Sequence, residues 1–293
     1  MGARVPGKRH RTARYGARMR FAAVQHDIAW MDPAPNWERI GNLLADARLP
    51  AGSFALLPEL CDVGFTMETD RLPRFDSLGT ARRLARSHAL WLQAGYADLG
   101  MNATRPTNRA AIIAPDGRAA GTYDKVHLFS PGREDRHYAA GRSITVIDVP
   151  SDQGTWKVCP LICYDLRFPE VFRLAALAGA EVFTVGANWP APRALHRRAL
   201  AVARAIENQA YVIACNRIGR DPHVEYAGDS FIVAPSGEVI AEAGDAERVI
   251  AADLDRDELL RWRERFPALR DLRRGLLGEI AVDATSCDSR ADD

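Results

Sequence analysis

Several features that would assign this protein to a specialised class are missing from its 293 residues. No apolar stretch reaches the roughly 18 residues that a membrane-spanning helix needs. The basic N-terminus also lacks the apolar segment of a secretory signal, so we expect no membrane partner and a cytoplasmic location. Only five cysteines are present, an odd and sparse set that favours free thiols in a reducing compartment over a disulfide framework.

Sequence motifs for common cofactors are absent as well. The chain has no Gly-x-Gly-x-x-Gly or phosphate-loop string for a nucleotide, and no Gly-x-Ser-x-Gly elbow for a serine hydrolase. Cys159 and Cys163 are separated by three residues, and no second Cys/His pair with metal-ligand spacing accompanies them. We therefore expect a protein that needs neither a metal nor a cofactor.

Net charge is small, at +1 from 39 basic and 38 acidic residues, which predicts no nucleic-acid partner. This balance hides a segregation, because seven basic and no acidic residues fall within residues 1–20. Residues 1–18 lack hydrophobic periodicity and are predicted to be a disordered basic extension. Nucleic-acid or membrane contact by this extension is the alternative hypothesis. Residues 276–293 are predicted to be an acidic flexible tail.

Between these ends, strand-like and helix-like segments alternate without a linker, which predicts one α/β domain over residues 19–275 with helices outside a sheet. The predicted strands are 20–25, 54–57, 90–96, 156–163, 182–185 and 211–215, with hairpins over 109–123 and 231–241. The predicted helices are 80–87, 169–178 and 192–209.

Three polar residues come where predicted strands end: Glu59, Lys125 and Cys163. Loops at the carboxyl ends of strands often gather such side chains into one crevice, although each residue alone is more often a solvated loop residue or a small buried hydrophobe. Together they supply a base, an ammonium for a developing oxyanion and a thiol nucleophile. The helix start at Phe168–Glu170 could further favour a thiolate or an oxyanion. This grouping suits acyl transfer through a thioester to water.

The strings around these residues resemble the three signature segments of the nitrilase superfamily, the carbon–nitrogen hydrolases. They are Leu57–Leu60, Tyr123–Phe129 and Leu161–Glu170, and they occur in the family's order over nearly the whole chain. The resemblance implies a four-layer αββα sandwich with a catalytic triad, in which Glu59 is the base, Lys125 the electrostatic stabiliser and Cys163 the nucleophile. It also implies a second glutamate near the triad. Glu134 is the best match, with Asp135 as a competitor.

A narrower resemblance points to the ω-amidase branch, which hydrolyses the terminal amide of 2-oxoglutaramate or succinamate and releases ammonia. It rests on Asn188–Arg193, Arg204–Tyr211, Cys215–Arg217 and Gly228–Ser230. Such a substrate carries a carboxylate at its far end, which calls for an arginine in the pocket. The predicted substrate-binding residues are Arg167 and Arg193, either of which could instead brace a loop, together with Asn188, Trp189 and Tyr164, whose backbone amide adjoins the nucleophile.

Several rival functions share the same chemistry. An amidase for deaminated glutathione, a general aliphatic amidase, an N-carbamoyl hydrolase and a true nitrilase would all use the triad, and a catalytically inactive scaffold would be expected to have lost one of its members. The helix at 192–209 carries many small residues, which allow close packing. The family resemblance implies a homodimer through such surfaces, whereas packing on the chain's own sheet is the alternative.

Overall fold

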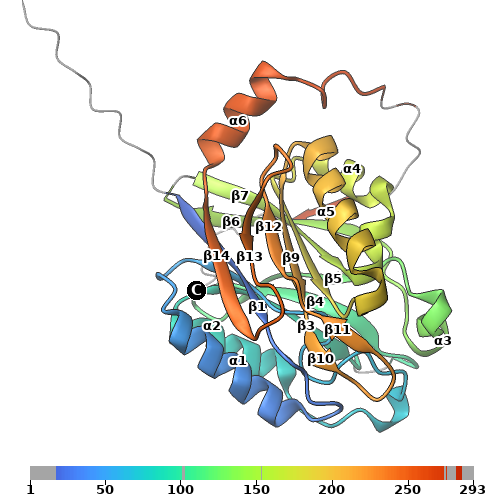
Figure 1. The fold of residues 1–293 in the computed structure, drawn as a ribbon. Coiled ribbons are helices and arrows are strands. Elements are labelled where there is room, and N and C mark those ends of the chain that lie inside the picture. Colours follow the sequence, from blue (N-terminus) through green and yellow to red (C-terminus); the bar gives the residue numbers. More distant parts are fainter. Residues whose placement is uncertain (1–17, 101–102, 153, 274, 276–281, 286–293) are drawn as a thin grey trace, which may run out of the picture.

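The computed structural model describes residues 18–100, 103–152, 154–273, 275 and 282–285. Residues 1–17 of the predicted basic extension, and most of the predicted acidic tail, lie outside them. Two large sheets form the centre of the fold (Figure 1). The first has the order β14-β1-β2-β3-β4-β5, and its strands are Arg248–Leu254, Met19–Gln25, Phe54–Leu56, Trp91–Asp98, Thr107–Ile113 and Ala119–Asp124. The second has the order β13-β12-β9-β8-β7-β6-β15, and its strands are Val239–Glu242, Phe231–Val233, Tyr211–Asn216, Val182–Ala187, Gly154–Ile162, Ile144–Ser151 and Val282–Thr285.

The two sheets pack face to face through large apolar side chains. Phe21 of β1 stacks on Phe54 of β2 at 5.2 Å between ring centroids, and its ring meets the edge of Trp156 from β7 at 5.6 Å. Side chains along a strand point alternately to its two faces, so Phe21 and Ala23 face the other sheet while Val24 faces outward. Central strands that are covered on both faces, such as β8 and β9, are buried along their whole length, whereas β5, β13 and β14 are partly exposed.

Helices cover the outer face of each sheet. The first sheet packs against α1 (Pro33–Ala47) and α2 (Ser77–His88), and the second against α4 (Pro169–Leu177) and α5 (Ala194–Asn208). Pro169 begins α4 at a position where its missing N–H is not needed. The predicted αββα sandwich is confirmed, and the predicted helices at 80–87, 169–178 and 192–209 correspond to α2, α4 and α5. A 3-10 turn at Ala191–Arg193 precedes α5.

Shorter elements surround the carboxyl ends of the central strands. They are α3 (Glu134–His137), the hairpin of β10 (Ile218–Arg220) and β11 (Glu225–Ala227), and the 3-10 turns Thr69–Arg71, Ser130–Gly132 and Cys163–Arg167. The helix α6 (Arg256–Arg265) lies at the opposite ends of β8 and β9, where Arg263 donates to the carbonyls of Ala180 and Gln209. Four residues of the segment predicted to be flexible, Val282–Thr285, form β15 and pair in parallel with β6. Among the described residues, no helix is both long and apolar enough to span a bilayer.

Candidate active site

Three strand ends bring Glu59, Lys125 and Cys163 together. Lys125 and Cys163 directly follow β5 and β7, and Glu59 follows β2 by three residues. The Nζ atom of Lys125 lies 2.7 Å from Oε1 of Glu59, and both side chains are fully buried. Glu59 and Lys125 come from the first sheet and Cys163 from the second, so the site spans the interface between the two layers (Figure 1).

Glu59 is held by close backbone packing on both sides. A Cβ atom added to Gly95 of β3 would lie 2.7 Å from the carbonyl oxygen of Pro58, and one added to Gly186 of β8 would lie 2.7 Å from that of Leu57. Contacts this short leave no room for a side chain, so glycine is required at both positions. The segment that carries Glu59 therefore passes between one glycine from each sheet.

Asn188 fixes the carboxylate of Glu59 from the second sheet. Its backbone N–H donates to Oε2 of Glu59 at 3.0 Å, and its side-chain amide donates to the Glu59 carbonyl at 2.6 Å. Asn188 directly follows β8 and lines the pocket at the same time. The predicted substrate-binding residue thus also orients the predicted base.

Lys125 lies between two carboxylates. Oε2 of Glu134, the first residue of α3, is 2.8 Å from Nζ and also accepts a hydrogen bond from the backbone of Phe129. Burial opposes the charged form of Lys125, but Glu134 and Glu59 outweigh it and raise the pKa of the ammonium. Burial raises the pKa of Glu134 in turn, against the lowering effect of Lys125. Glu134, rather than the competitor Asp135, is the acid that faces the lysine.

Cys163 occupies a strained turn between β7 and the 3-10 segment Cys163–Arg167. Its φ of 44° is a left-handed value that is uncommon outside glycine and occurs preferentially at functional sites. Burial, followed by the charge of Glu59, raises the pKa of the thiol well above its usual range. The thiol is therefore neutral at rest.

Asp165 connects the loop of Lys125 to the turn of Cys163. This fully buried carboxylate accepts hydrogen bonds from the backbone of Ile162 at 3.0 Å, from the backbone of His127 at 3.0 Å and from the Tyr123 hydroxyl at 2.8 Å. The ring of His127 also lies 2.9 Å from Asp165 and stacks on Phe168. Asp165 thus links Tyr123 and His127, two positions before and after Lys125, to Ile162, which directly precedes the nucleophile.

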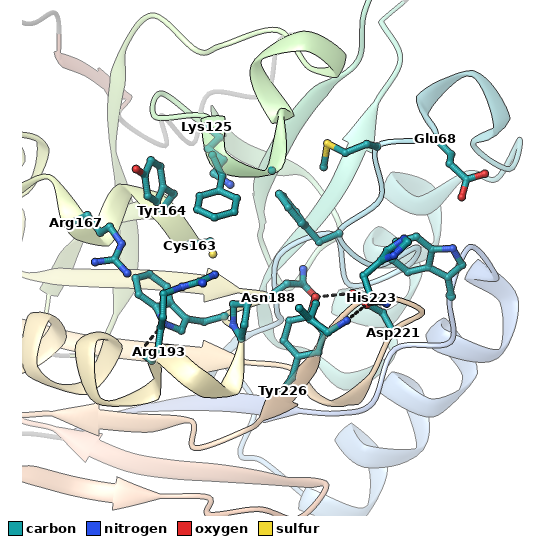
Figure 2. A pocket seen from close by; sticks show the side chains of 18 residues that line it. Glu68, Lys125, Cys163, Tyr164, Arg167, Asn188, Arg193, Asp221, His223 and Tyr226 are labelled. Carbon is teal, nitrogen blue, oxygen red and sulfur yellow. Dashed lines mark hydrogen bonds between the residues drawn. The ribbon is translucent and has the colours of Figure 1, made fainter.

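A pocket with a volume of about 310 Å³ opens above Cys163. The five residues predicted to bind substrate line it: Tyr164, Arg167, Asn188, Trp189 and Arg193 (Figure 2). The Arg167 guanidinium stacks on Trp189 at 4.8 Å from the ring centroid, and that of Arg193 lies 5.6 Å from the centroid of Phe129. Neither guanidinium forms an ion pair with a carboxylate of the described residues. This wall of the pocket therefore carries two cations available to an anionic ligand.

Other pocket residues were not predicted from the sequence. Among them are Trp30, Phe65, Asp221 and His223. The Asp221 carboxylate already accepts hydrogen bonds from two backbone N–H groups of the β10–β11 turn and from the Tyr226 hydroxyl. In Figure 2 His223 and Asp221 lie across the pocket from Arg167. They come from loops whose positions depend on long-range packing, and no local motif marks them. Within the described part of the chain, no group of three or more His, Cys, Asp or Glu side chains could hold a metal ion.

Removal of the buried ammonium should destabilise the fold. Lys125→Ala leaves two buried carboxylates without a cation, and we expect it to lower the free energy of unfolding by about 3–5 kcal/mol near neutral pH. The folded variant holds a proton on Glu134 more tightly than the unfolded chain, whose glutamate pKa is about 4.5. Stability should therefore decline as the pH rises above about 4.5, measured by urea denaturation across pH.

Lys157→Ala is the matched control, because Lys157 pairs with Asp148 at the surface. We expect that substitution to cost about 1 kcal/mol or less at every pH. A Lys125→Ala variant with the stability of the control across this range would contradict the buried charge arrangement.

Known proteins resemble this chain over most of its length. The carbon–nitrogen hydrolase family profile matches residues 20–264. The chain is 36% identical to Omega-amidase YafV of Escherichia coli (strain K12), with 86% of this chain and 96% of that protein covered. It is 32% identical to 2-oxoglutaramate amidase of Bacillus subtilis (strain 168), with 87% and 98% covered.

Solved structures show the same architecture. A CN-hydrolase superfamily protein of Xanthomonas campestris, with an arsenic adduct in its active site, superposes with a TM-score of 0.77 at 31% identity and covers 87% of this chain and 97% of that one. An amidase of the nitrilase superfamily from Nesterenkonia, solved as a mutant in which alanine replaces a cysteine, superposes with a TM-score of 0.75 at 25% identity and covers 89% and 96%. The chain belongs to the carbon–nitrogen hydrolase family of the nitrilase superfamily.

Proposed function

We propose that this protein is an amidase that hydrolyses the terminal amide of a dicarboxylate monoamide, such as 2-oxoglutaramate or succinamate. The observation that carries the proposal is a buried thiol beside the Lys125–Glu59 ion pair, beneath a pocket wall with two arginines. Relatives named ω-amidase and 2-oxoglutaramate amidase support the same reaction.

The first half of the proposed reaction forms a thioester. Sγ of Cys163 attacks the amide carbonyl carbon while its proton passes to Glu59, because the neutral thiol needs a base. The Lys125 ammonium and the backbone N–H of Tyr164 stabilise the negative charge that develops on the carbonyl oxygen. Glu59 then returns the proton to the amide nitrogen, the C–N bond breaks, and ammonia leaves.

The second half hydrolyses the thioester. Glu59 takes a proton from a water molecule as its oxygen attacks the acyl carbon, and the collapsing intermediate releases Sγ, which regains the proton. Glu134 supports the reaction by holding Lys125 in place. Side chains of the site and the backbone N–H of Tyr164 handle every proton and charge in this scheme, so the proposed mechanism requires no cofactor.

Substrate choice in this proposal depends on the pocket arginines. Arg167 and Arg193 would bind the distal carboxylate of the substrate, while the amide lies over Cys163. Trp189 supports this wall, because its indole N–H donates to the Arg193 carbonyl at 2.8 Å and its ring packs under Arg167. An uncharged amide of similar length would lose this interaction.

The central experiment is a screen for ammonia release with wild-type protein and Cys163→Ala. We expect the wild-type protein to hydrolyse 2-oxoglutaramate and succinamate faster than glutamine, asparagine, deaminated glutathione or a simple nitrile. We expect no detectable turnover by Cys163→Ala, because the thioester cannot form. Undiminished turnover by the variant would refute the assigned nucleophile. Preference for the nitrile or for deaminated glutathione would refute the substrate class.

A second experiment tests the carboxylate site. Arg167→Met and Arg193→Met keep an unbranched apolar stem at each position and remove the charged guanidinium. We expect kcat/KM for succinamate to fall about ten- to hundredfold in at least one variant, since a hydrogen bond to a charged group is worth about 1.5–3 kcal/mol. Butyramide, which has a methyl group where succinamate has its carboxylate, is the control substrate and should react at an unchanged rate. Equal losses on both substrates would argue against carboxylate binding.

We also propose a homodimer in which α5 of one chain packs on α5 of a second. Leu195 and Ile206 are 76% and 52% exposed, and their spacing of eleven residues puts them on one face of this helix. Size-exclusion chromatography with light scattering should give the mass of two chains, and Leu195→Glu should give the mass of one, because it would bury two charges at the interface. Arg142→Glu, at an exposed residue away from α5, is the control. A monomeric wild-type protein would overturn the proposal.

A further inference from the structure

Asn108 contacts both glutamates of the catalytic cluster. It is the second residue of β4, and its side chain is fully buried. The amide Nδ2 donates to Oε1 of Glu59 and to Oε1 of Glu134, both at 2.8 Å. The same two oxygens lie 2.7 Å and 3.1 Å from Nζ of Lys125. Four hydrogen bonds thus form a closed ring with two acceptors, one cationic donor and one neutral donor.

The carboxylates determine which way this amide points. Oδ1 of Asn108 is buried and has no partner among the described residues, a rare condition for a buried polar atom. Exchange of the amide oxygen and nitrogen would place Oδ1 against two carboxylate oxygens, which would repel it. The observed orientation requires acceptor oxygens on both glutamates at once, as two ionised carboxylates provide.

The charge balance of the cluster explains why such a donor is useful. Two fully buried carboxylates share one ammonium, so the cluster carries one negative charge more than the ammonium neutralises. Burial and the charge of Glu59 both raise the pKa of Glu134. Among the described residues, Cys163, Tyr138 and Tyr226 also interact with the cluster, and none of these three adds positive charge. A neutral donor stabilises both ionised forms without changing the net charge.

We propose that Asn108 is a positioning residue that keeps Glu59 and Glu134 ionised together and aligned with Lys125, so that Glu59 can accept the thiol proton. This inference rests on the proposed amidase function. Asn108 does not reach the pocket that would hold the substrate, and it acts only through the two carboxylates. Its loss should therefore change the pH at which the site becomes competent more than the affinity for substrate.

The test compares pH profiles of Asn108→Leu, Asn108→Asp and wild type. Leucine has a similar volume and no donor, so one glutamate should keep its proton to a higher pH. We expect the acid limb of kcat/KM to move up by about one pH unit, with activity recovering at alkaline pH and KM little changed. Aspartate matches the shape but adds a third carboxylate, so its activity should stay low as the pH rises.

Controls separate this role from packing. Asn208→Leu removes a fully buried asparagine at the end of α5 that bonds only within its own helix, and its acid limb should match that of wild type. Thermal melting identifies variants that fail to fold. If Asn108→Leu does not fold, the isosteric variant Asn108→Asp still tests the proposal. A uniform loss at every pH in Asn108→Leu, or wild-type activity in Asn108→Asp, would overturn the proposal.

A readout without substrate keeps the inference independent of the proposed function. The rate at which iodoacetamide alkylates Cys163 is measured across pH, with Cys163→Ala as the blank for other thiols. The acid limb of this profile should move up in Asn108→Leu as it does for turnover. An unmoved limb would refute the role of Asn108 even if amides are hydrolysed, whereas a moved limb without any amide turnover would refute only the amidase assignment.

Discussion

The buried contact between Lys125 and its two glutamates is the interaction on which the rest of the site depends. An ammonium taken out of water is costly unless carboxylates and hydrogen bonds replace the solvent. Glu59 and Glu134 replace it here at 2.7 Å and 2.8 Å, and the chain must bring them from separate loops to do so. One lysine thereby fixes the predicted base and provides a positive charge beside the thiol. The same contacts raise the pKa of the Lys125 ammonium.

The sandwich provides the rigidity that this charge cluster needs. Glu59 and Lys125 follow strands of one sheet and Cys163 follows a strand of the other, so their distances depend on how the sheets pack. Asn188 and Asp165 add hydrogen bonds across the same boundary. The thiol is neutral at rest, so it gains reactivity only where a nearby carboxylate can take its proton. Geometry, more than a lowered thiol pKa, is what the fold contributes to the proposed chemistry.

The sequence predicts the parts of this arrangement that local patterns encode. Apolar runs that end in a polar residue locate Glu59, Lys125 and Cys163 correctly at strand ends, and the helix of Pro169 begins where proline favours it. Asn108 could not be found in the same way. A bulge near Ile112 shifts the register of the β4–β5 hairpin by one residue, so a count from the turn would place Asn108 opposite Asp124. In the structure its carbonyl accepts from the backbone of Lys125 instead.

The two glycines beside Glu59 have a consequence for the tolerance of this chain to mutation. Gly95 and Gly186 carry no functional group, and neither belongs to the pocket lining. Even a methyl group at either position would push on the backbone of residues 57–59 and displace the base before it altered any chemistry. A saturation scan scored by turnover would therefore show these two positions to be as intolerant as the nucleophile itself. Residues that never meet a substrate would then look catalytic in such data.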